Sequence, residues 1–104
     1  MYNGAMNRAD VIARLKTVEP ALRKRGVAAL YLFGSHARDE AQAGSDVDVF
    51  VDPADESDFG LMSFMDTLAM LERAFPETEI GYSTREGIVP AYLPLIEASA
   101  VRVF

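Results

Sequence analysis

The chain contains no cysteine and a single histidine. Without cysteine it can form neither a disulfide framework nor a thiolate metal site, and one histidine leaves little room for a zinc centre. The oxygen atoms of 16 aspartates and glutamates remain as ligands, and such hard ligands suit magnesium. A metal site in this protein is therefore expected to consist of carboxylates.

Positive charge is also scarce in this sequence. Ten lysines and arginines stand against the 16 acidic residues, which gives a formal net charge of −6 at pH 7. Phosphate backbones are held mainly by Lys and Arg, so this balance argues against a polymerase or a tRNA-modifying role. We expect no direct nucleic-acid binding.

Long hydrophobic runs are missing too. No stretch approaches the length of a membrane span, and the N-terminus lacks a basic region followed by an apolar core, so the expected location is the cytoplasm. The 104 residues, half of them apolar, suffice for one hydrophobic core. The sequence predicts a single domain over residues 1–104, with residues 1–6 as a loose N-terminal tail.

The most informative segment begins with an apolar run at residues 28–33, which predicts a buried strand. Gly34 and Ser35 follow it, and then a helix-compatible stretch. A strand that turns at glycine into a helix N-terminus directs free backbone N–H groups and the positive end of the helix dipole to one spot. A phosphate can bind there, although a Gly-Ser turn is also a common structural connection.

Two carboxylates, Asp46 and Asp48, come ten residues after this turn. The strand period of two places both on one face and Val47, Val49 and Val51 on the other. Neighbouring carboxylates on one face repel each other, which is tolerated mainly when a cation lies between them. The valine face is therefore predicted to pack and the aspartate face to hold metal, the alternative being a solvated surface pair.

The pattern Phe-Gly-Ser-x-Ala-Arg at residues 33–38, followed by Ser-Asp-x-Asp-x-x-Val at residues 45–51, resembles the minimal nucleotidyltransferases. These are small stand-alone members of the DNA polymerase beta superfamily. The resemblance covers nearly the whole chain and implies the polymerase beta-like α/β (α+β) fold, a small mixed sheet flanked by helices. Such proteins usually occur beside a small all-helical HEPN-type toxin. The implied function is an antitoxin that transfers AMP from ATP to a tyrosine of that toxin.

The resemblance also implies a catalytic and metal-binding set of Asp46, Asp48 and a third carboxylate on the next strand, which matches Glu79. The two aspartates would bridge two magnesium ions, and the third carboxylate would ligate the ion that activates the attacking oxygen. The family more often has Asp at this third position. The extra methylene of Glu79 can displace the carboxylate oxygens by roughly 1 Å, an error that is costly to catalysis. The alternative is a surface charge on an edge strand.

The nucleotide-binding set that the resemblance implies is Gly34, Ser35, Arg38 and Ser45. Ser35 would place its hydroxyl and N–H group on the β- and γ-phosphates, while its alternative role is that of helix N-cap. Arg38 lies in the first turn of the expected helix, where a cation opposes the dipole. We expect it to face an anion: the triphosphate, a carboxylate such as Asp46, or an acidic partner.

Two neighbouring residues receive no functional role. His36 could touch a nucleotide or a partner, but we expect a lone histidine near a site to be an accessory surface residue. Asp52 shares the face of Asp46 and Asp48 by parity, but Pro53 follows it at the strand end. A solvated turn residue is therefore expected at position 52.

The remaining pattern predicts alternating elements. Asn7 is the expected N-cap of a first helix that reaches about Lys24 and is interrupted at Pro20. Further helices are predicted over residues 36–42, 59–75 and 90–98. Strands are predicted over 28–33, through the two aspartates to Pro53, over 77–82 and over 100–104. The short connection between the first two strands favours an antiparallel pair.

The predicted helix over 59–75 carries more apolar residues than one core-facing stripe needs, and the surplus residues are Met62, Phe64, Ala69 and Met70. They indicate either a helix buried on two sides or a contact surface for another protein. Three functions stay open at this point. They are protein adenylylation, neutralisation of a helical toxin by occlusion alone, and nucleotidyl transfer to a small molecule.

Overall fold

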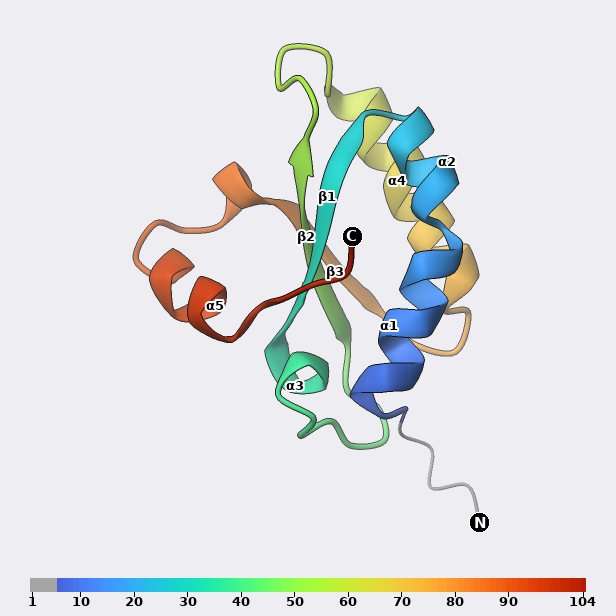
Figure 1. Ribbon diagram of the computed structural model, residues 1–104, viewed down its shortest axis with the longest axis vertical. Helices are drawn as coiled ribbons and strands as arrows, with labels where there is room; N and C mark the ends of the chain where they lie inside the picture. The colour runs from blue at the N-terminus through green and yellow to red at the C-terminus, as the bar shows by residue number, and fades with distance from the viewer. Residues whose placement is uncertain (1–5) are drawn as a thin grey trace.

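A four-stranded sheet runs through the centre of the computed structural model, which describes residues 6–104 (Figure 1). Its strands are β1 (Val27–Phe33), β2 (Val47–Pro53), β3 (Ile80–Thr84) and β4 (Val101–Arg102), in the order β3-β2-β1-β4. β1 is antiparallel to both β2 and β4, whereas β2 and β3 are parallel. The sheet is therefore mixed, and the predicted antiparallel pairing of the first two strands is confirmed.

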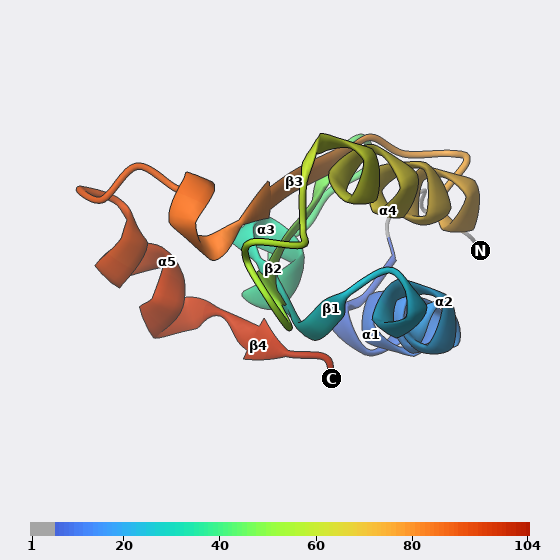
Figure 2. The ribbon, with the colours of Figure 1, turned by 90° about the horizontal axis from the view of Figure 1, so that it is seen from above.

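Helices cover both faces of this sheet (Figure 2). α1 (Arg8–Thr17), α2 (Glu19–Lys24) and α4 (Leu61–Ala74) lie on one face. The short α5 (Leu93–Ser99) and the 3-10 turn η1 (Arg85–Gly87) lie on the other. α3 (Gly34–Ala37) is a single turn at the end of β1. The fold is thus the predicted α/β arrangement of a small mixed sheet flanked by helices.

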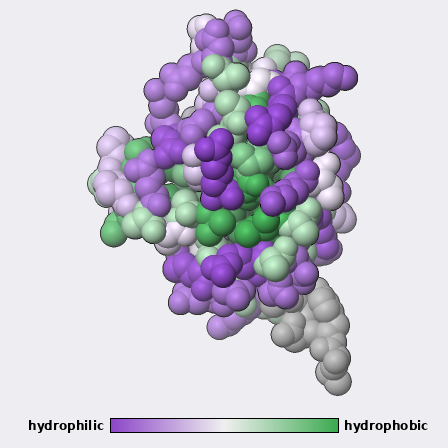
Figure 3. Space-filling model, viewed as in Figure 1, coloured by the Kyte–Doolittle hydropathy of each residue, from purple (hydrophilic) through white to green (hydrophobic). Residues whose placement is uncertain are grey.

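The face toward α1, α2 and α4 forms the hydrophobic core. Its strand residues are the alternating positions of β1 and β2, as the sequence pattern predicts: Leu30, Leu32, Val47, Val49 and Val51. Leu71 and Phe75 from the α4 region and Val11 and Leu15 from α1 close over them. Each such side chain contributes about 1.5–3 kcal/mol by leaving water. In Figure 3 further apolar residues gather at the middle of the face where the C-terminal segment lies.

The opposite face of the sheet carries aromatic rings at the alternate positions. Tyr31 of β1 stacks on Phe50 of β2 with ring centroids 4.8 Å apart, and Phe33 lies 5.8 Å from the same ring. Phe50 is only 1 % exposed, and these two rings and the Arg85 guanidinium lie against it. This aromatic layer forms the floor on which α5 rests.

Arg85 fastens α5 to that floor. Its Nε and Nη2 groups donate to the two carboxylate oxygens of Asp52 at 2.8 and 2.9 Å, and Nη1 donates to Glu97 of α5. The guanidinium also lies 4.9 Å and 4.8 Å from the ring centroids of Tyr31 and Phe50. Asp52 is therefore an ion-paired anchor, and the expectation of a solvated turn residue there is wrong.

The helix signals near the N-terminus are confirmed. The Asn7 side chain accepts a hydrogen bond from the Asp10 N–H at 2.8 Å, and Pro20 stands in the first turn of α2, where the first helix divides. Of the predicted tail at residues 1–6, only Met6 is described, and it packs against the core. Within residues 6–104 no helix is both long and apolar enough to cross a membrane.

Several other elements differ from their predicted ranges: α5 begins at Leu93 instead of residue 90, and β4 is confined to Val101–Arg102. The helix expected over residues 36–42 is the single turn α3, because Asp39 adopts a left-handed φ of 58° that cannot continue a helix. The strand expected over 77–82 is β3, which begins only at Ile80. Before it the chain forms a turn, in which the Thr78 N–H donates a hydrogen bond to the Phe75 carbonyl.

We expect Arg85→Lys to lower the free energy of unfolding by about 1 kcal/mol. Lysine keeps the charge but loses the bidentate hydrogen bond to Asp52 and the stacking on the aromatic rings. Chemical denaturation measures this change. The matched control is Arg25→Lys, whose half-exposed pair with Asp66 has an N–O distance of 3.8 Å. That variant should change stability by less than about 0.5 kcal/mol. Equal effects of the two substitutions would contradict the anchoring role of Arg85.

Candidate nucleotide-binding site

The turn between β1 and α3 is shaped by Gly34. Its φ is +76°, a conformation that strains any other residue. A Cβ at this position would also lie 2.5 Å from Oδ2 of Asp48. Since α3 begins here, the N–H groups of its first turn have no intrahelical partner. The turn therefore offers backbone donors beside a carboxylate, as the sequence predicts for a phosphate site.

The Asp48 carboxylate lies in a slot between two glycines. In the sheet Asp48 is level with Phe33 of β1 on one side and with Gly81 of β3 on the other. A Cβ on Gly81 would collide with Oδ1, as one on Gly34 would with Oδ2. Both oxygens thus lie against glycine backbone. No sequence pattern singles out Gly81, because its role depends on the register between β2 and β3.

Burial raises the pKa of the Asp48 carboxyl, and the nearby charge of Asp46 raises it further. His36 and Arg38 act in the opposite direction and lower it. The net upward direction means that the free protein favours the negative charge on Asp48 less than water does. A cation bound at this point would remove that cost.

Asp46 lies at the exposed end of the loop that precedes β2, and His36 fixes its backbone. The Nδ1 atom of His36 is 2.9 Å from the Asp46 carbonyl oxygen, and the histidine is only 4 % exposed. The expectation that His36 is a surface residue is therefore wrong. It is buried under the loop and positions Asp46.

Ser45 shapes the same loop. Its hydroxyl accepts a hydrogen bond from the Gln42 N–H at 2.9 Å, and its carbonyl accepts one from the Thr78 hydroxyl at 3.0 Å. These contacts tie the loop to the turn that leads into β3. Nucleotide contact by Ser45 stays a prediction.

Glu79 lies beside Asp46 rather than beside Asp48. It is exposed and directly precedes β3, and its carbonyl accepts the Val47 N–H at 2.9 Å. Asp46 and Glu79 line a polar hollow of about 530 Å³ together with residues 44 and 76–78. Across residues 6–104, no three His, Asp or Glu side chains form a group that could hold a metal ion. The structure thus joins Asp46 with Asp48 and leaves Glu79 at the rim.

Arg38 follows the turn and is exposed. Its Nε–H donates to the Glu40 carboxylate at 2.9 Å, so the anion that the structure gives it is a neighbour in the chain. Exposed pairs of this kind contribute at most about 1 kcal/mol. A phosphate at the Gly34 turn could therefore replace Glu40 as the partner of Arg38 at little cost.

The two aspartates fit a magnesium ion that arrives with a nucleotide. Mg²⁺ is usually held by one or two carboxylates together with substrate phosphates and water. Asp46 and Asp48 supply the carboxylates, and the pKa of Asp48 is raised first by burial and then by the charge of Asp46, a cost that a bound cation would relieve. The Gly34 turn, whose backbone N–H groups could receive phosphates, adjoins Asp48. The donor set therefore suits one such ion directly.

Comparison with known proteins agrees with this geometry. Residues 15–89 match the nucleotidyltransferase domain family, and the chain belongs to that family. A solved structure described as a minimal nucleotidyltransferase is 24% identical with a TM-score of 0.77, and the match covers 92% of this chain and 95% of that one. The resemblance to minimal nucleotidyltransferases is thereby confirmed. Curated proteins gave no significant match.

Two more distant structures share the fold. A toxin–antitoxin crystal structure with AMP-PNP is 17% identical with a TM-score of 0.65, over 95% of this chain and 73% of that one. A protein from Sulfolobus solfataricus, described as a nucleotidyltransferase, is 15% identical with a TM-score of 0.53, over 91% and 80% of the two chains. At these identities the likeness concerns the fold alone.

The slot for Asp48 predicts a coupling between two strands. Gly81→Ala should lower the free energy of unfolding by about 1–3 kcal/mol, because the new methyl group displaces the carboxylate. In an Asp48→Ala background the same substitution should cost clearly less, since the colliding oxygen is gone. Denaturation of the four proteins in this double-mutant cycle gives the coupling energy.

The control for this cycle is Gly60→Ala at the start of α4, where a Cβ would meet open space. Its effect should be the same in the wild-type and the Asp48→Ala backgrounds. If Gly81→Ala were also equally costly in both backgrounds, Asp48 would not depend on the glycine beside it.

Proposed function

We propose that this chain is a magnesium-dependent nucleotidyltransferase that binds ATP and transfers AMP to a tyrosine hydroxyl of an all-helical, HEPN-type toxin in the cytoplasm. The observation that carries the proposal is the Asp48 slot. A pair of carboxylates shares one strand end with a glycine turn whose backbone can receive phosphates. Membership of the nucleotidyltransferase family supports the reaction class.

In this proposal the residues divide between phosphate binding and metal binding. The backbone of Gly34 and the backbone and hydroxyl of Ser35 receive the β- and γ-phosphates, and Arg38 leaves Glu40 to join them. Ser45 holds the loop that presents Asp46. Asp46 and Asp48 hold magnesium, which when bound neutralises the triphosphate and favours ionisation of the attacking hydroxyl.

The proposed transfer needs only ATP and the tyrosine hydroxyl as reactants. The tyrosine oxygen forms a bond to the α-phosphorus of ATP, and the bond from that phosphorus to the bridging α–β oxygen breaks. Pyrophosphate leaves with the electron pair, and the hydroxyl proton passes to solvent. The products are the AMP-modified tyrosine and pyrophosphate.

Glu79 is assigned to the acceptor side. It shares the polar hollow with Asp46, on the side of the site away from the Gly34 turn. From there it would serve a second magnesium ion beside the attacking oxygen. The proposal requires the Glu79 side chain to turn toward Asp46 when nucleotide and acceptor are bound.

A second candidate function is occlusion of the toxin without catalysis. The position of β3 that is level with Asp48 holds Gly81, so the carboxylate pair has no acidic neighbour there. α4 also exposes three large apolar side chains on the other face of the sheet: Leu61 at 74%, Met62 at 73% and Met65 at 52%. Of the surplus residues expected on this helix, Phe64 instead stacks on Tyr82, and Met70 packs against the core. The exposed trio is a surface for a protein partner.

The double variant Asp46→Asn/Asp48→Asn separates the two candidates. It should abolish magnesium-dependent ATP binding in calorimetry while thermal stability rises or stays level, because two repelling charges are removed. Mass spectrometry of the co-expressed partner toxin should find a tyrosine carrying AMP with the wild type and none with the variant. The control is Asp55→Asn/Asp58→Asn in the exposed loop before α4. It removes the same amount of charge and should preserve both magnesium-dependent ATP binding and AMP transfer to the toxin.

An unmodified but silenced toxin with both the wild type and the double variant would favour occlusion. Failure of the wild type to bind ATP with magnesium, together with unfolding of the double variant, would make the carboxylates structural.

Glu79→Gln should reduce transfer by about 100-fold or more while ATP affinity changes by less than about threefold, because the residue acts on the acceptor side. The control is Glu77→Gln, which lies in the same hollow but pairs with Arg14. Single-turnover rates and calorimetry measure the two quantities. Equal losses, or none, would leave Glu79 as a surface charge. A faster Glu79→Asp variant would show that the longer side chain costs activity.

A further inference from the structure

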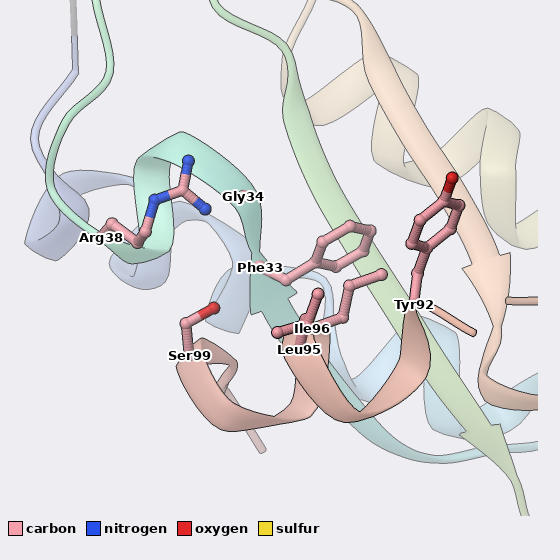
Figure 4. Close-up of a pocket in the computed structure, with 7 residues that line it drawn as sticks. All are labelled: Phe33, Gly34, Arg38, Tyr92, Leu95, Ile96 and Ser99. Atoms are coloured by element: carbon pink, nitrogen blue, oxygen red, sulfur yellow. The ribbon is translucent and has the colours of Figure 1, made fainter. Parts of the chain in front are cut away.

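A second hollow opens on the other side of the Gly34 turn, between the end of β1 and α5 (Figure 4). Its volume is about 310 Å³, and its walls are apolar, formed by Phe33, Tyr92, Leu95 and Ile96. In Figure 4 these four side chains lie close together, while Arg38 and Ser99 lie at the opposite end near Gly34. The hollow therefore has an aromatic and aliphatic part and a polar part, and the polar part adjoins the phosphate turn.

Two of the four apolar side chains of this hollow are largely exposed to solvent, and the other two are half-buried. Leu95 is 72% exposed and Tyr92 is 61% exposed, and every residue of α5 is at least partly exposed. α5 is held over the sheet by the ion pairs of Arg85 with Glu97 and Asp52, in addition to its own contacts with β1. Its apolar side chains are thus available for a flat apolar ligand instead of being used up in the fold.

The geometry points to a nucleobase as that ligand. We propose that Phe33, Tyr92, Leu95 and Ile96 form the base subsite of the nucleotide whose phosphates lie at the Gly34 turn, an inference that rests on the proposed function. Gly34 belongs to both the turn and the hollow, so one nucleotide can reach both. Bases stack on aromatic side chains.

The size and lining of the hollow agree with a base rather than a whole nucleotide. Sites for complete small ligands usually have about 300–1,000 Å³, so this hollow lies at the lower end. Phe33 is level with Asp48 in the sheet, which brings a ring on Phe33 next to the carboxylate slot. The other hollow, beside Asp46, is lined by Glu77 and Glu79 and presents no aromatic wall. It suits the acceptor side, and the apolar hollow suits the base.

The test compares two magnesium-loaded probes in calorimetry: ATP, and inorganic tripolyphosphate, which has the phosphates but no base. Leu95→Ser and Tyr92→Leu should each weaken ATP binding by about tenfold, because each removes apolar or stacking contact with the base. Both variants should bind tripolyphosphate within about twofold of the wild type, because the phosphate turn is intact. Tyr92→Phe keeps the ring and should recover most of the ATP affinity that Tyr92→Leu loses.

The matched control is Leu61→Ser on α4, since Leu61 is as exposed as Leu95 but lies on the opposite face of the sheet. It should leave both affinities unchanged. Unaltered circular dichroism and thermal melting would show that the variants are folded, as the exposure of Leu95 and Tyr92 leads one to expect.

Each other outcome overturns the inference in a recognisable way. Equal losses for ATP and tripolyphosphate would mean that α5 acts through the phosphate turn. Unchanged ATP affinity with reduced transfer to the toxin would mean that the hollow holds the acceptor ring. A wild-type chain that binds tripolyphosphate as tightly as ATP has no base subsite, while the proposed function survives. If neither probe binds, the nucleotide site itself fails.

Discussion

The rest of the site depends on one packing constraint, the placement of the Asp48 carboxylate against the backbones of Gly34 and Gly81. A charged group that is half-buried between two strands needs compensation, and its raised pKa shows that the free protein supplies too little. The glycines remove side chains that would otherwise fill the slot, and β2 fixes the direction of the carboxylate. The same strand buries Val47, Val49 and Val51 in the core, so the strand that carries Asp48 is anchored by close packing.

The two faces of the sheet have separate tasks because of this strand. The face with α1, α2 and α4 stabilises the fold by apolar burial, while the face with α5 carries the aromatic layer, Arg85 and the aspartates. Arg85 acts within the second face, where its single guanidinium holds α5 on the sheet through charge and ring contacts. The site face can therefore keep its apolar surface open for a ligand without weakening the core.

Much of this could be predicted from alternation and turn chemistry. The packing of the valines, the strand-to-turn geometry at Gly34 and the antiparallel pairing of β1 and β2 are local consequences of sequence. That Gly81 pairs with Asp48 could not be predicted, because the pairing depends on the parallel register between β2 and β3. The burial of His36 and the hollow under α5 likewise arise from contacts between distant segments. The helix expected after Gly34 is also shorter than predicted, because Asp39 has a positive φ. The sequence gives no sign of this, since positive φ angles are usually found at glycine.

The bond between His36 and the Asp46 carbonyl has a consequence for the thermodynamics of ligand binding. It fastens the far end of the loop at residues 38–46 to the turn at which the loop begins, and Ser45 fastens it again to the turn before β3. These hydrogen bonds therefore hold the Gly34 turn and the loop that carries Asp46 together. In the proposed function, a nucleotide bound there would have few backbone torsions left to order, so little conformational entropy would be lost on binding. The enthalpy of the charged contacts is then available for affinity instead of offsetting loop closure.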